Sequence, residues 1–174
     1  MRRDEKQITD RAEIDAVIRS SRTCRLGMSD GNQPYVIPLC FGYDGGALYF
    51  HCAPVGRKLE ILRKNPRVCV EFDVAGDVLE AEHACSWGIT FQSVVVFGTA
   101  LFVDAPEEKK TALSLLMAQY SRPGQEFSFP DASVSRTTII KVVIDEITGK
   151  QSVRQQSPAR DKQRPPKTAP FTCA

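Results

Sequence analysis

Residues 23–51, TCRLGMSDGNQPYVIPLCFGYDGGALYFH, alternate between strand-like runs and tight turns. Asp30-Gly31-Asn32 predicts a hairpin turn, and Asp44-Gly45-Gly46 predicts a second turn soon after it. The strand-like runs joined by these turns cover residues 23–29, 33–43 and 47–51. Pro34 and Pro38 suggest that the second run lies at a sheet edge or is bulged, because proline cannot donate to a strand ladder. Three strands in succession favour an antiparallel barrel over a βαβ fold.

The rest of the chain adds three helices and three further strands. One helix should end before Pro66, because a residue that precedes proline disfavours helical geometry. The helices are expected over residues 10–21, 57–65 and 104–120, the last with Leu113, Leu116, Met117 and Tyr120 buried, and the strands over 67–73, 93–103 and 137–145. Residues 74–86 show no regular pattern, and residues 122–136 are expected to form a polar loop.

The strand over 93–103 is almost wholly apolar, so we expect both of its faces to be covered, with Phe97 in the core. The expected fold class is mainly β with peripheral helices, in one domain over residues 1–153. From Ser157 onward the chain is rich in Pro, Lys and Arg, which predicts a flexible basic tail over residues 154–174.

The composition limits the classes of partner. The chain has 174 residues, 42% hydrophobic and 25% charged, which is enough for one ordinary core. A net charge of +2 gives no electrostatic argument for nucleic acid or an anionic membrane. No secretory signal or membrane-spanning run is present, and the six cysteines have neither disulfide nor zinc spacing. These features predict a cytoplasmic protein with free thiols that binds no nucleic acid and no membrane.

The segment from His51 to Lys58, HCAPVGRK, combines a strand end, a Pro/Gly turn and two adjacent cations at the start of a helix. Gly56 allows the backbone to approach a ligand, and the first-turn N–H groups are free to donate. Arg57 can form bidentate hydrogen bonds to phosphate oxygens, whereas Lys58 acts as a point charge. The segment therefore suggests a phosphate-binding turn, although adjacent Arg-Lys pairs on helices are more often simply solvated.

Further motifs accompany this turn in order along the chain. They are Tyr35-Val36-Ile37-Pro38, Gly42-Tyr43-Asp44, Asn65-Pro66-Arg67-Val68, Ser86-Trp87-Gly88, and Ser93-Val94 followed by Gly98. With them the sequence resembles the pyridoxamine 5′-phosphate oxidase-like flavin-binding superfamily, and most closely its branch of nitroimidazole-resistance (Nim) and related flavin-nucleotide-binding proteins. The resemblance covers about residues 6–153.

The resemblance implies a split β-barrel, a homodimer, and FMN bound in clefts at the dimer interface. Arg57 and Lys58 correspond to the phosphate-binding pair, and Ser93 occupies a flavin-contacting position. His51 corresponds to a histidine near the flavin and the substrate site. The residues expected to contact the cofactor are Pro38, Leu39, Cys40, Phe41, His51, Cys52, Arg57, Lys58, Trp87, Ser93 and Val94. Trp87 would either stack near the flavin or fill the dimer interface.

The expected function is FMN-dependent reduction of small molecules, with nitroaromatic compounds such as nitroimidazoles as candidate substrates. His51 is the candidate catalytic residue, as a proton donor. The chain has no Gly-x-Gly-x-x-Gly motif, so NAD(P)H would bind transiently over the flavin. The C-terminal Trp and Arg-Leu-x-Pro elements of the oxidases are missing, which argues against vitamin B6 oxidation. Two alternatives stay open: a non-catalytic flavin carrier or sensor, and a haem-binding barrel.

Overall fold

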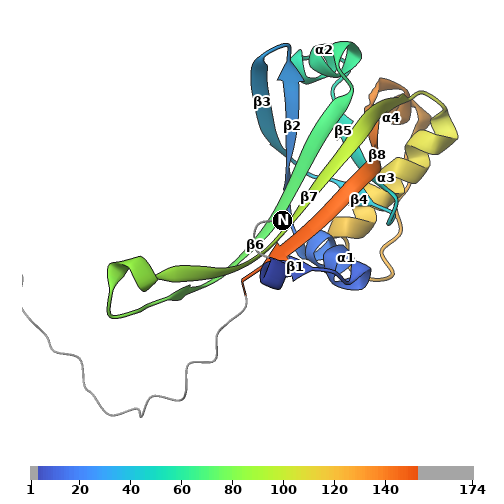
Figure 1. Ribbon diagram of the computed structural model, residues 1–174. Coiled ribbons are helices and arrows are strands. Elements are labelled where there is room, and N and C mark those ends of the chain that lie inside the picture. The colour runs from blue at the N-terminus through green and yellow to red at the C-terminus, as the bar shows by residue number, and fades with distance from the viewer. Residues whose placement is uncertain (1–3, 153–174) are drawn as a thin grey trace, which may run out of the picture.

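The computed structural model describes residues 4–152 and consists of one curled antiparallel sheet with helices around it (Figure 1). The strands are β1 (Gln7–Ile8), β2 (Cys24–Asp30), β3 (Gln33–Leu39), β4 (Gly42–Tyr43), β5 (Ala47–Cys52), β6 (Arg67–Leu79), β7 (Gly88–Val103) and β8 (Thr138–Gln151). Their order in the sheet is β3-β2-β6-β7-β8-β5-β4, and β1 pairs with β8. No pairing joins β3 to β4, so the described sheet is an open, split barrel.

The helices cover the ends and one side of this sheet. They are α1 (Arg11–Ser20), α2 (Arg57–Lys64), α3 (Pro106–Tyr120) and α4 (Asp131–Arg136), with short 3-10 turns η1 (Asp4–Lys6) and η2 (Ala84–Ser86). The Asp10 side chain caps α1 by accepting a hydrogen bond of 3.0 Å from the Ala12 N–H. Helix α1 contacts β6 and β7, α2 contacts β2, and α3 contacts β4 and β5. None of the described helices is long and apolar enough to cross a bilayer.

The main core fills the inside of the curled sheet. Phe41, Phe50 and Phe72 are its largest fully buried side chains, and the rings of Phe41 and Phe72 meet edge to face at 4.9 Å. Burying aromatic side chains of this size is worth roughly 2–3 kcal/mol each. The core therefore fixes the strand β5 and the segment between β3 and β4, which carry several of the predicted cofactor contacts.

The two faces of β7 differ. Even-numbered residues such as Val94 and Val96 are completely buried, because they point into the core. The odd-numbered residues lie on the other face. We call this set the outer row: Ile89, Phe91, Ser93, Val95, Phe97, Thr99 and Leu101. Beyond it, Val103 is covered by α3 through Ala112.

Several expectations from the sequence need correction. Phe97 is 44% exposed rather than part of the core, and Tyr120 is also exposed, whereas α3 buries Ala112 and Leu116. The expected loop over 122–136 contains α4, and the expected run over 33–43 is broken between Leu39 and Gly42. The strands β6, β7 and β8 are all longer than predicted. The predicted tail over residues 154–174 lies outside the described residues.

Candidate functional site

The turn between β5 and α2 is the strongest candidate for an anion site. Gly56 is the N-cap of α2 and has a φ of 139°, a conformation that side chains rarely adopt. Its carbonyl oxygen accepts hydrogen bonds from the N–H groups of Leu59 and Glu60, at 2.9 and 3.3 Å. Within residues 4–152, the N–H groups of Arg57 and Lys58 have no partner. Two donors at a helix N-terminus are therefore free for a ligand.

The side chains of Arg57 and Lys58 add two positive charges without a counter-ion. Neither forms an ion pair with any described carboxylate. The exposed guanidinium of Arg57 lies 4.8 Å from the centre of the Tyr35 ring, a distance typical of a cation–π contact. Because Leu59 and Leu62 anchor α2 in the core, both cations are held at the rim of the barrel. Charge, free N–H groups and rigidity together suit a phosphate.

Lys58 also acts on the neighbouring thiol of Cys52, the last residue of β5. Burial raises the pKa of the Cys52 thiol above its ordinary value of 9.0. The charge of the Lys58 ammonium and its hydrogen bond to the sulfur oppose this rise in pKa, because both favour the thiolate. Cys52 is thus a half-buried neighbour of the candidate anion turn.

The segment from Pro38 to Phe41 covers the end of β3 and the connection to β4. Pro38 and Cys40 are exposed, whereas the ring of Phe41 is completely buried. The Phe41 N–H donates to the Tyr120 hydroxyl at 3.0 Å, and that hydroxyl donates to the Arg22 carbonyl oxygen at 2.9 Å. Phe41 therefore positions this segment, and only Pro38 and Cys40 present exposed side chains to a ligand.

Ser93, Val94 and Trp87 do not lie at the turn, whereas His51 directly precedes Cys52. His51 is exposed and pairs with Ile139 of β8, whereas Ser93 pairs with Lys150 of β8. These two positions on β8 are eleven residues apart (139 to 150), which is roughly 35 Å along a strand. Val94 is completely buried, and Trp87 lies beyond Ser93 at the tip of the β6–β7 hairpin. One chain thus holds two separate groups of predicted contacts.

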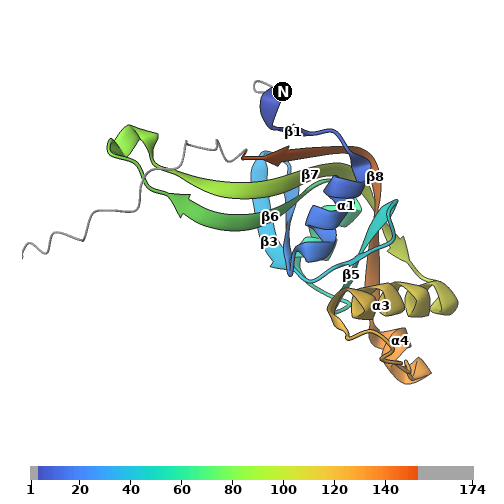
Figure 2. The same ribbon diagram turned by 90° about the horizontal axis from the view of Figure 1, so that it is seen from below.

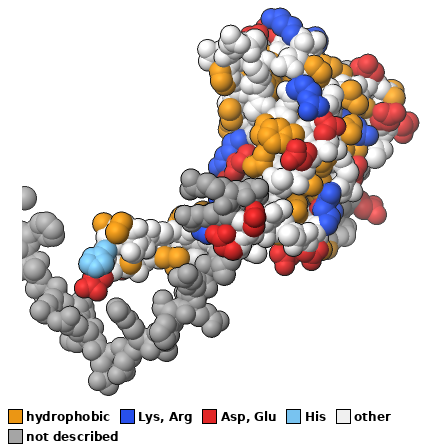
Figure 3. Space-filling view, in the orientation of Figure 1, with side chains coloured by type: hydrophobic (Ala, Val, Ile, Leu, Met, Phe, Trp, Pro, Cys, Tyr) orange, Lys and Arg blue, Asp and Glu red, His pale blue; other side chains and the backbone are white. Residues whose placement is uncertain are grey.

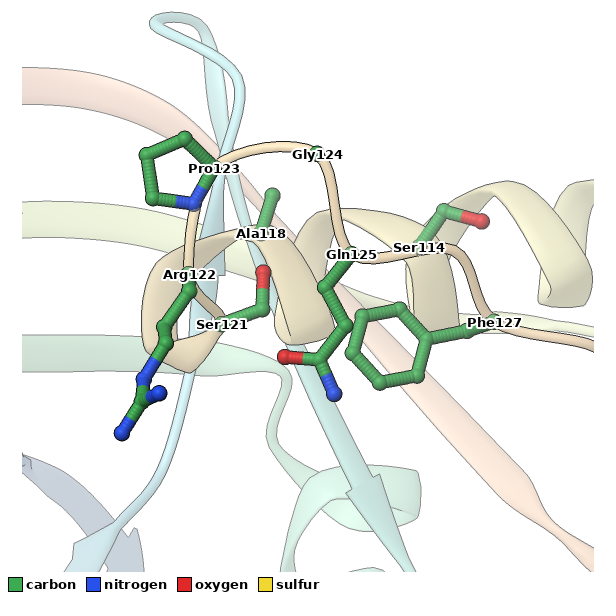
Figure 4. Close-up of a pocket in the computed structure, with 8 residues that line it drawn as sticks. All are labelled: Ser114, Ala118, Ser121, Arg122, Pro123, Gly124, Gln125 and Phe127. Atoms are coloured by element: carbon green, nitrogen blue, oxygen red, sulfur yellow. The ribbon is translucent and has the colours of Figure 1, made fainter.

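Three hollows of the described chain are lined by residues other than the predicted contacts. One of about 430 Å³ lies where α3 ends, between side chains such as Gln125 and Phe127 of the following loop (Figure 4). A second of about 490 Å³ lies between α3 and α4. A third of about 390 Å³ crosses the outer face of the sheet beside Val36, Cys69 and Phe97.

Sequence reasoning missed two residues at the site. Tyr35 supports Arg57, and Tyr120 holds the backbone of Phe41. Tyr35 could have been found, because it alternates with Ile37 and Leu39 on the inward row of β3. Nothing in the sequence connects Tyr120 to Phe41, since they are 79 positions apart.

The fold is an open split barrel, and the turn between β5 and α2 is a candidate anion site on it. The model of the pyridoxamine 5′-phosphate oxidase family matches residues 10–151. The chain therefore belongs to the pyridoxamine 5′-phosphate oxidase-like family, which confirms the family expected from the sequence.

Individual relatives support the family and the fold. The chain is 33% identical to a candidate 5-nitroimidazole antibiotic resistance protein from Bacteroides thetaiotaomicron, with a TM-score of 0.75, covering 83% of this chain and 86% of that one. It is 27% identical to an uncharacterized protein of Rhizobium meliloti, over 83% of this chain and 93% of the relative. A FAD- and heme-binding protein from Mycobacterium smegmatis has a TM-score of 0.78 at 19% identity, covering 97% and 91% of the two chains, and shares the fold.

Proposed function

We propose that this chain binds FMN and uses it to reduce small molecules, with nitroaromatic compounds as the candidate substrate class. The observation that carries the proposal is the pair of uncompensated cations and free N–H groups at the start of α2. The donor set fits the phosphate of a flavin nucleotide, which carries up to two negative charges. Membership of a flavin-associated family and the likeness to the Bacteroides protein support the cofactor and the substrate class.

Each residue of the rim has a separate task in this proposal. Arg57 and Lys58 hold the phosphate, and the backbone near Pro38 and Cys40 borders the ring system. When bound, the flavin supplies the electron transfer, with NAD(P)H as the transient donor. His51 is exposed at the end of β5 and can donate a proton to a reduced nitro group. Ser93 and Trp87 lie far from this rim, so they can contribute only from a second copy.

The outer face of the sheet supports a homodimer. Exposed apolar side chains gather over β6, β7 and β8 (Figure 3), and Phe97, Leu101 and Val143 are among them. Sheet faces exposed in this way usually mark an interface. Some charged groups on this face are paired, Arg25 with Glu71 and Asp73, and Arg67 with Asp145. Glu146 beside Phe97 and Lys141 beside Leu101 carry opposite charges on the same face and form no ion pair with the described residues.

The first experiment identifies the ligand of the purified full-length protein. We expect flavin absorption bands, FMN after denaturation and mass spectrometry, and bleaching by NADH or NADPH without oxygen. Reoxidation by a nitroimidazole should follow. A Soret band would overturn the proposal in favour of haem. Flavin without bleaching or turnover would overturn the reductase role and leave a carrier or sensor.

His51 and the dimer each have a specific test. A His51→Gln variant should keep FMN bound and lose about a hundredfold or more in turnover, the usual range for a proton donor. Full turnover in this variant would remove His51 from the chemistry.

Phe97→Lys should convert a dimer to a monomer in sedimentation, whereas Phe127→Lys should not, because Phe127 is 37% exposed but lies in the loop after α3. A Phe97→Lys dimer would exclude the outer face as the interface.

A further inference from the structure

The hairpin formed by β6 and β7 extends well beyond the barrel. We call residues 75–90 the arm, and Figures 1 and 2 both show it standing away from the rest of the chain. None of its residues is buried. Support from neighbouring strands ends at Glu71 on β6, which faces β2, and near Phe91 on β7, which contacts Ser152. Within the described residues the arm is therefore a hairpin of two strands, and such a hairpin is marginal in water unless something packs on it.

The tip of the arm holds a tryptophan in a fixed position. The Trp87 indole N–H donates to the Ala81 carbonyl oxygen at 2.8 Å, although the side chain of Trp87 is 52% exposed. Two positions further along β7, Ile89 pairs with Val78, and both of these side chains are exposed as well. A fixed, exposed tryptophan beside exposed aliphatic side chains is typical of a contact surface.

The arm also carries negative charge without a counter-ion. It contains no lysine or arginine, and we call its three acidic residues the arm acids: Asp77, Glu80 and Glu82. None of them forms an ion pair with a cation of residues 4–152. Glu80 directly follows β6 and Trp87 directly precedes β7, so both lie at the same end of the hairpin. The arm therefore offers uncompensated carboxylates beside an apolar surface.

The part of the chain that follows the described residues has the complementary composition. Residues 153–174 contain five cationic side chains and one acidic side chain. Three of the cations lie close together in the sequence, and we call them the tail cations: Arg160, Lys162 and Arg164. The adjacent prolines Pro165 and Pro166 follow them directly. Proline-rich segments are typical ligands of aromatic surfaces, and cationic side chains are attracted to the face of a tryptophan ring.

This segment starts at the foot of the arm. The Ser152 N–H donates to the Phe91 carbonyl oxygen at 2.8 Å, and the Phe91 N–H donates to the Ser152 hydroxyl at 2.7 Å. From Phe91 to Trp87 is four positions (91 to 87), or about 13 Å along a strand. From Ser152 to Arg160 is eight positions (152 to 160), which can span up to about 28 Å. The tail cations are therefore within reach of Trp87 and of the arm acids.

We infer that residues 153–174 dock on the arm of the same chain, with the tail cations against the arm acids and the proline pair against Trp87. Exposed ion pairs are individually weak, so the docking depends on several of them acting together. Attachment at the foot of the arm gives the segment an effective concentration of about the millimolar range, which favours it over a separate basic protein. Trp87 thereby gains a role that is independent of the flavin.

Charge reversal in the full-length, ligand-free protein tests the inference. Trp87 is the only tryptophan of the chain, so intrinsic fluorescence reports its environment alone. Reversal of the tail cations, by Arg160→Glu/Lys162→Glu/Arg164→Glu, should shift the emission to longer wavelength by several nanometres and increase its quenching by acrylamide. Additional reversal of the arm acids, by Asp77→Lys/Glu80→Lys/Glu82→Lys, should restore the wild-type emission, because the same pairs form with opposite signs. A shift that the second reversal does not restore would overturn the pairing.

The matched control reverses three exposed arginines outside the arm, just after α1 and α3 and at the end of α4. Arg22→Glu/Arg122→Glu/Arg136→Glu changes the net charge equally and should leave the Trp87 emission unchanged, and an equal shift would overturn the docking. In the wild type, about 1 M NaCl should reproduce the shift, because the Debye length falls to about 3 Å. An emission that ignores tail reversal and salt, and changes only on dilution, would overturn the inference and assign the cover of Trp87 to a second copy.

Discussion

Helix α2 has the sequence RKLEILRK, with the same two cations at each end, and each arginine lies over an aromatic ring, yet the ends differ in their free N–H groups and in the partner of the lysine. Arg57 and Lys58 stand at the N-terminus beside free N–H groups and have no carboxylate partner. Lys64 pairs with Asp30 at 3.6 Å, and Arg63 lies over the ring of Phe102. The helix dipole favours anions at the first end and cations at the second. Whether an Arg-Lys pair indicates a ligand site therefore depends on the end of the helix at which it lies.

The largest effect should be the difference in FMN affinity between removing the Arg-Lys pair at the N-terminus of α2 and removing the pair at its C-terminus. Arg57→Ala/Lys58→Ala should weaken FMN binding by at least about a hundredfold, since two charge-assisted contacts are removed. Arg63→Ala/Lys64→Ala removes the same charge and should change the affinity less than about threefold. Fluorescence titration of the ligand-free proteins measures both. Equal losses in the two variants would mean that net charge, rather than the helix end, binds the phosphate.

The second effect concerns the backbone at the N-terminal end. Gly56→Ala forces a side chain into a conformation with φ of 139°, which costs roughly 1–3 kcal/mol. We expect a lower Tm and FMN affinity weakened about tenfold, because the free N–H groups move. Gly124→Ala is the matched control, since Gly124 also has a positive φ, of 81°, in the loop after α3. It should lower the Tm without changing the affinity, and an equal loss of affinity would exclude a specific role for Gly56.

The third effect is the change in the pKa of the Cys52 thiol when the positive charge of Lys58 is removed. Because the ammonium opposes the rise in the Cys52 pKa, Lys58→Met should raise that pKa further. The thiolate is the reactive form, so alkylation of Cys52 should begin at higher pH in the variant. Peptide mapping after iodoacetamide treatment across pH 7–10 follows Cys52 separately from the exposed Cys40 and Cys85. Lys64→Met should leave the profile unchanged, and a shift there would point to a general charge effect.

The smallest effect lies at the C-terminal end of α2. The Lys64–Asp30 pair is largely exposed, and such pairs contribute about 0.5 kcal/mol or less. Lys64→Ala should therefore lower the free energy of unfolding by no more than that, as measured by urea denaturation. A loss above about 1 kcal/mol would show that α2 depends on this contact for its position on β2.

Local patterns were enough to predict much of the fold. The β2–β3 hairpin, α1 and α2 follow from turn residues, spacing and the position of Pro66, and their bounds are close to those expected. The outer part of the β6–β7 hairpin, residues 75–90, could not be predicted, because none of its residues is buried and its side chains show no regular alternation. The helix α4 was missed because it has six residues and buries only Val134.

The residues of the candidate site differ in how far the sequence alone predicts their place in it. Arg57 and Lys58 follow from residue type and the Pro/Gly turn, whereas Ser93 and His51 depended on the resemblance to a family. Phe97 was wrongly placed in the core. The apolar sequence of β7 indicates that both faces of this strand are apolar, but it does not show which face packs against the core of the same chain. Tyr120 was out of reach, since its bond to Phe41 depends on how α3 docks.

The strand β7 also has a consequence for the nascent chain. Its sixteen residues, GITFQSVVVFGTALFV, contain no charge and no proline. Uncharged segments of high β-propensity without proline are prone to aggregate before folding is complete. The neighbouring strands carry the gatekeeping charges instead, such as Arg67 and Glu71 on β6 and Lys141 on β8. We therefore expect Phe97→Lys to increase the soluble yield on expression, because the apolar face proposed to join two copies also belongs to the segment that is prone to aggregate in each new chain.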